Sequence, residues 1–141
     1  MAGKTDFTQQ EWETLHKGVA GGGLLVSVSD RGFFDTFKEA GALAKHLTGA
    51  RQSSSELVRE LAATRGTGFG LTASPSEVET ETLDALRSAI ATLQSKAPDE
   101  VDPYRELVLD VAQSVADAAG GGDTEEGGAL DKIRFALGAT M

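Results

Sequence analysis

The chain has 141 residues, a formal net charge of −9 and no cysteine. The length suggests a single domain, residues 1–141, with a sizeable buried core. A sequence without cysteine excludes disulfides and thiolate metal ligands, and an acidic surface disfavours nucleic acid as a partner. The first fifteen residues hold no apolar core of a signal peptide, and no apolar run is long enough to span a membrane. We therefore expect a cytoplasmic protein without membrane insertion.

Helix starts are marked by a recurring spacing of Ser or Thr followed by Glu three residues later. This spacing is typical of a capping box, in which each residue of the pair accepts a hydrogen bond from the backbone amide of the other. The spacing occurs at residues 8–11, 36–39, 53–56 and 74–77. Asp102 followed by Pro103 indicates a further start, with the aspartate as cap and the proline at the first helical position. Five such starts predict an all-helical chain.

Apolar residues at three- and four-residue steps support the same prediction. One stripe runs through residues 78–97 and a second through 104–119, with shorter stripes in 37–47 and 57–62. This is the period of helices that bury one face. Trp12, with an apolar residue three positions later, is predicted to lie in the core.

The segment GGGLLVSVS, residues 21–29, is ambiguous by itself. Alternating Val and Ser residues favour a strand, and each of the three glycines opposes a helix by about 1 kcal/mol. A shift of 87 residues, from 27 to 114, however, places this segment on residues 109–116, inside the second long stripe. We therefore predict that residues 20–30 form a buried helix whose glycines allow another backbone to approach closely.

The same shift reveals an internal similarity. Residues 27–47 and 114–134 are identical at 8 of 21 aligned positions. Both stretches contain a helix end with an acid, a short connection, a second acid and an apolar stripe. We interpret them as two copies of a helical hairpin, at about residues 20–47 and 103–137, separated by a loop at 64–77. The predicted fold is an all-α, single-domain bundle of six or seven helices with two pseudo-repeated helical hairpins.

The stretches SVSDRGFFDTFKEAGALAK and SVADAAGGGDTEEGGALDKI carry this pattern, and FTQQEWETLHKG precedes it. Together they resemble the TerB-like tellurite-resistance family of small bacterial helical proteins. The resemblance implies a non-enzymatic, stress-associated protein with a divalent-cation site. The ligands that it implies are Asp30, Glu39, Asp117 and Glu126.

Two interpretations of these four acids remain open. Hairpins packed face to face would bring the carboxylates together, and Ca²⁺ or Mg²⁺ would relieve their mutual repulsion. Alternatively, the acids only cap and solvate helix ends: Glu39 belongs to a capping box, and Glu126 suits a helix N-terminus. In that case Asp30 and Asp117 are solvated residues at helix C-termini.

An enzyme is disfavoured, because no pairing of a nucleophile with a general base is visible in the sequence. The alternative function is a ligand-free structural or adaptor protein that acts by self-association or by binding an unknown protein partner. Phe33 and Phe34 hint at such a surface, because two adjacent phenylalanines cannot easily face the same core.

Overall fold

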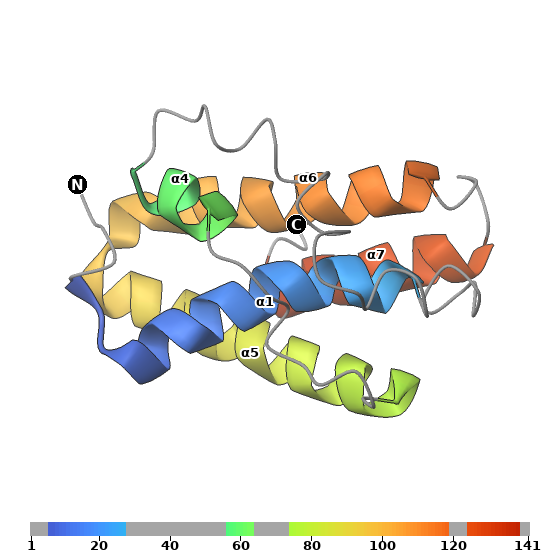
Figure 1. Ribbon diagram of the computed structural model, residues 1–141, viewed down its shortest axis with the longest axis horizontal. Coiled ribbons are helices and arrows are strands. Elements are labelled where there is room, and N and C mark those ends of the chain that lie inside the picture. Colours follow the sequence, from blue (N-terminus) through green and yellow to red (C-terminus); the bar gives the residue numbers. More distant parts are fainter. Residues whose placement is uncertain (1–5, 28–55, 64–73, 119–123, 139–141) are drawn as a thin grey trace.

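The computed structural model describes residues 6–27, 56–63, 74–118 and 124–138 (Figure 1). Within these ranges the chain forms α1 (Gln9–Ser27), α4 (Glu56–Ala63), α5 (Pro75–Lys96), the 3₁₀ turn η3 (Pro98–Glu100), α6 (Val101–Ala118) and α7 (Thr124–Ala136). The described residues contain no strand, which confirms the all-α class. The single domain, the count of six or seven helices and the pseudo-repeat of two hairpins stay predictions.

Helix α1 is the central element of the bundle, with α4 and α6 on one side and α5 on the other (Figure 1). Every residue from 18 to 26 is buried. A helix that is covered on all sides needs no polar face, which explains its mixture of glycine, leucine and valine. The predicted helix at 20–30 is therefore confirmed up to Ser27, and residues 28–30 lie outside the described residues.

The start of α1 is fixed by the predicted capping box. The amide of Thr8 donates to Glu11 Oε1 at 2.9 Å, and the amide of Glu11 donates to Thr8 Oγ1 at 3.1 Å. Phe7 packs on Trp12 with 6.3 Å between ring centroids, so an apolar staple accompanies the box. The ammonium of Lys96 pairs with Glu11 and thereby ties the start of α1 to the end of α5.

Helix α5 begins where the second described capping pair predicts. The amide of Glu77 donates to Ser74 Oγ at 3.3 Å, and Pro75 occupies the first turn. The last residues of the predicted loop 64–77 are thus helical, and residues 64–73 lie outside the described residues. All seven positions of the predicted stripe are buried: Val78, Thr82, Leu86, Ala89, Ile90, Leu93 and Ala97.

Helix α6 buries its predicted stripe from Tyr104 to Val115, and residue 119 lies outside the described residues. The start of α6 differs from the prediction. The turn η3 leads directly into Val101, so Asp102 lies inside the first turn and is not the N-cap. Pro103 is tolerated there because first-turn amides have no acceptor within the helix. The prediction that Asp102 is the N-cap was therefore wrong, because the preceding 3₁₀ turn is already helical and continues directly into α6 at Val101.

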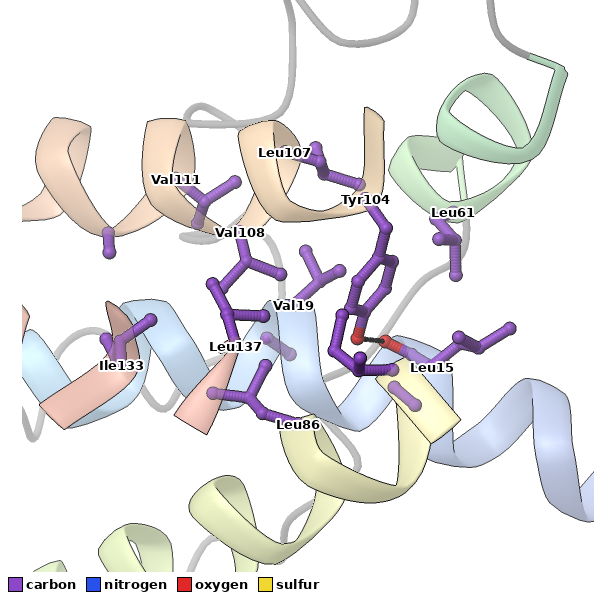
Figure 2. Close-up of a cluster of buried hydrophobic side chains, with 14 of the residues drawn as sticks. Leu15, Val19, Leu61, Leu86, Tyr104, Leu107, Val108, Val111, Ile133 and Leu137 are labelled. Carbon is purple, nitrogen blue, oxygen red and sulfur yellow. Dashed lines mark hydrogen bonds between the residues drawn. The ribbon is translucent and has the colours of Figure 1, made fainter. Parts of the chain in front are cut away.

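Glycines of α1 face larger side chains of α6. The fully buried Tyr104 hydroxyl donates to the carbonyl oxygen of Leu15 at 2.7 Å (Figure 2). A Cβ atom on Gly18 would lie 2.3 Å from that hydroxyl, and one on Gly22 would lie 3.2 Å from Val108 Cγ1. The prediction was that another backbone approaches the glycines of residues 20–30. At Gly22 the side chain of Val108 comes closest, and the carbonyl oxygen of Val108 would lie 3.9 Å from the added Cβ atom.

These pairs also give the direction of packing. Gly18 faces Tyr104 and Gly22 faces Val108, so both pairs are separated by 86 residues (104 − 18 and 108 − 22). Because the partner on α6 advances as the residue on α1 advances, the two helices run parallel. Figure 1 shows the same arrangement, with both helices ending at one end of the bundle.

Helix α7 returns along α6 and is held at its C-terminus. Arg105 Nε of α6 donates to the carbonyl oxygen of Leu137 at 2.8 Å, and Gly138 follows with φ of +72°, the left-handed geometry of a helix end. Lys132 pairs with Glu79 of α5. Helices α6 and α7 thus occupy the residues of the second predicted hairpin.

The crossing of α1 and α5 contains a buried hydroxyl at Thr82. A Cβ atom on Gly21 would lie 2.2 Å from Thr82 Oγ1, so the helices are in close contact there. The hydroxyl has no hydrogen-bond partner among the described residues. A buried polar group without a partner lowers the free energy of unfolding.

We expect Thr82→Val to raise the free energy of unfolding by about 1–2 kcal/mol, because it replaces this hydroxyl by a methyl group of similar shape. Urea unfolding measures the change. Thr80→Val is the matched control, since Thr80 is exposed on the same helix and its change should stay within about 0.5 kcal/mol. A less stable Thr82→Val protein would show that the hydroxyl is satisfied.

Candidate functional site

The structure places the four predicted ligands only in part. Asp30 and Glu39 lie outside the described residues. Asp117 is the second-last residue of α6, and Glu126 is the third residue of α7; for both, the structure describes the backbone alone. An acid thus lies at the end of α6 and another at the start of α7. Whether the carboxylates meet stays a prediction.

The end of the bundle at which these acids lie gathers several helix termini. Helices α1 and α6 run parallel, so their C-terminal ends, Ser27 and Ala118, point the same way. Helix α7 begins at Thr124 at this end of the bundle (Figure 1). The C-terminal ends of α1 and α6, which are the first helices of the two predicted hairpins, therefore lie at one end of the bundle with the start of α7.

The register of the two parallel helices is close to the offset of the internal similarity. The packing pairs are 86 residues apart, as at Gly22 and Val108, and the sequence similarity has an offset of 87 residues, as from 27 to 114. Residues that correspond in the sequence alignment therefore lie beside each other, within one position, along the paired parts of α1 and α6.

Helix dipoles of both signs meet at this end of the bundle. The carbonyl ends of α1 and α6 each carry the negative pole of a helix dipole, equivalent to roughly half an elementary charge. Neither helix has a basic residue in its last turn as described. The N-termini of α5 and α7 lie at the same end and carry positive poles, so the helix dipoles there offset one another in part.

No group of three or more His, Cys, Asp or Glu side chains is placed for a metal ion within residues 6–27, 56–63, 74–118 and 124–138. None of the helices in these ranges is long and apolar enough to cross a bilayer.

A buried titratable group lies elsewhere, in the first half of α1. His16 is 7% exposed, and burial lowers its pKa below the ordinary value of 6.5, because a charge is poorly solvated there. The sequence carried a signal for this burial. Trp12, Val19 and Ala20 lie four before, three after and four after His16, so they share its side of the helix.

This histidine predicts a loss of stability in mild acid. Unfolding restores the ordinary pKa, so below pH 6.5 the unfolded chain binds more protons than the folded one. Stability is therefore full above pH 6.5 and decreases as the pH falls, until His16 is protonated in the folded state as well. The slope from one such group reaches at most about 1.4 kcal/mol per pH unit.

Urea unfolding between about pH 5.5 and 7.5 measures this slope. In His16→Leu the slope should become shallower, because the side chain at this position no longer titrates. His46→Gln removes the other histidine, so a slope that is kept there and reduced in His16→Leu assigns the pH dependence to His16. An unchanged slope in His16→Leu would assign the pH dependence to other groups.

No family model matches the chain, and no curated protein or solved structure is similar enough to count as a match. The TerB-like resemblance therefore stays a prediction from the sequence.

Proposed function

We propose that the protein is a non-enzymatic, cytoplasmic helical protein of the TerB-like kind that binds a divalent cation through Asp30, Glu39, Asp117 and Glu126. The observation that carries this proposal is the parallel packing of α1 on α6. The C-terminal ends of both helices lie at one end of the bundle. In the sequence, Asp30 and Glu39 follow the end of α1, and Asp117 and Glu126 belong to the end of α6 and the start of α7.

The register of the parallel helices supports a meeting of the two pairs. Asp30 follows Ser27 by three residues. The packing offset of 86 residues, added to 30, gives position 116, which adjoins Asp117. The two acids are therefore near-equivalent positions in the sequence register. Glu39 and Glu126 each follow nine residues later and retain that equivalence.

The charge at this end of the bundle also favours a cation. Four carboxylates in one place would repel one another. A divalent cation would offset that repulsion. An ordinary salt bridge would need a base, and the last turns of α1 and α6 contain none.

The chemistry of the ligands selects the class of cation. All four are carboxylate oxygens, which suit Ca²⁺ and Mg²⁺. Zn²⁺ generally takes nitrogen or sulfur ligands, and the sequence has no cysteine. Calcium tolerates irregular geometry and several carboxylates, whereas magnesium requires near-octahedral coordination and retains water. We therefore propose calcium first and magnesium second.

A titration with CaCl₂ and MgCl₂ at constant ionic strength tests the proposal, with calorimetry and thermal unfolding as readouts. A cation that binds only the folded protein raises stability by RT ln(1 + [L]/Kd), or about 1.4 kcal/mol at ten times Kd. We expect Tm to rise with cation concentration. The double variant Asp117→Asn/Glu126→Gln should lose this rise.

The matched control is Glu106→Gln/Asp110→Asn, which removes the same charge from exposed positions of α6. It should retain the cation-dependent rise in Tm. If both double variants lose it equally, the effect is general screening of negative charge. If millimolar calcium, magnesium, manganese and zinc all leave Tm unchanged, the cation proposal is wrong. A ligand-free structural or adaptor protein then remains, and light scattering tests its self-association.

A further inference from the structure

We draw no further inference here: the strongest candidate, the surface patch at Phe135 on α7, is a single exposed apolar side chain, and nothing among the described residues shows what covers it.

Discussion

Tyr104→Ala is expected to lower the free energy of unfolding by about 4 kcal/mol, the range found when large aromatic side chains are removed from a core. Tyr104 is fully buried and extends from α6 toward α1 (Figure 2). Truncation removes the ring and also its hydrogen bond to the carbonyl oxygen of Leu15. The resulting cavity would lie where α1 and α6 are held in register.

Urea unfolding followed by the fluorescence of Trp12 measures this loss, because Trp12 is the only tryptophan and is buried. Tyr104→Phe is the matched control, since it keeps the ring and removes only the hydroxyl. It should cost about 1 kcal/mol, the net value of one hydrogen bond. A loss below about 1.5 kcal/mol for Tyr104→Ala would show that the ring is not part of the core.

Local sequence patterns predicted the helices well because their causes are local. The capping boxes at Thr8 and Ser74 depend on residues three positions apart. The buried stripe of α5 depends on the helical period alone. For residues 21–27, local propensity favoured a strand, and the similarity to residues 109–116 decided for a helix. Burial on all sides explains the outcome, since tertiary packing outweighs glycine propensity.

Contacts between helices could not be predicted in the same way. The hydrogen bond from Tyr104 to Leu15 joins residues 89 positions apart, and the Lys17–Glu81 pair joins residues 64 positions apart. Each depends on the relative rotation and shift of two helices. The buried stripe restricts the rotation of a helix about its own axis. It does not determine how far the helix is shifted along its neighbour. The cap at Asp102 was misplaced because η3 continues into α6 at Val101 without an intervening non-helical residue.

The candidate site was predictable only in part: the positions of its acids at helix ends follow from the local sequence, and the contacts between those ends do not. The similarity predicted acids at a helix end and at the next helix start, and the boundaries of α6 and α7 place Asp117 and Glu126 there. Their meeting with Asp30 and Glu39 depends on two conditions. The first condition is the parallel direction of α1 and α6, which is seen in long-range contacts such as that of Gly18 with Tyr104. The path of the connections is the second condition and stays a prediction.

Gly18→Ala is expected to destabilise the protein by about 2 kcal/mol, although alanine is the better helix former. The helix propensity favours alanine by about 1 kcal/mol. The new Cβ atom, however, would lie 2.3 Å from the Tyr104 hydroxyl and 3.0 Å from Leu86 Cδ2. Overpacking of this kind costs about 1–3 kcal/mol, and displacement of the hydroxyl loses a further hydrogen bond of about 1 kcal/mol. Urea unfolding measures the net loss.

A double-mutant cycle with Tyr104→Phe assigns this loss to the clash with the hydroxyl. Without the hydroxyl, the new Cβ atom meets Leu86 Cδ2 at 3.0 Å, which is the mobile end of a side chain, and the ring carbon Cζ at 3.6 Å. Gly18→Ala should therefore cost at least about 1 kcal/mol less in the Tyr104→Phe background. Gly21→Ala is the control, because its Cβ atom would meet Thr82 of α5, 2.2 Å away, and Tyr104→Phe leaves that contact unchanged. Additive losses at Gly18 would mean that α1 and α6 are held in register by contacts other than this one, and the parallel alignment on which the cation proposal depends would lose its main support.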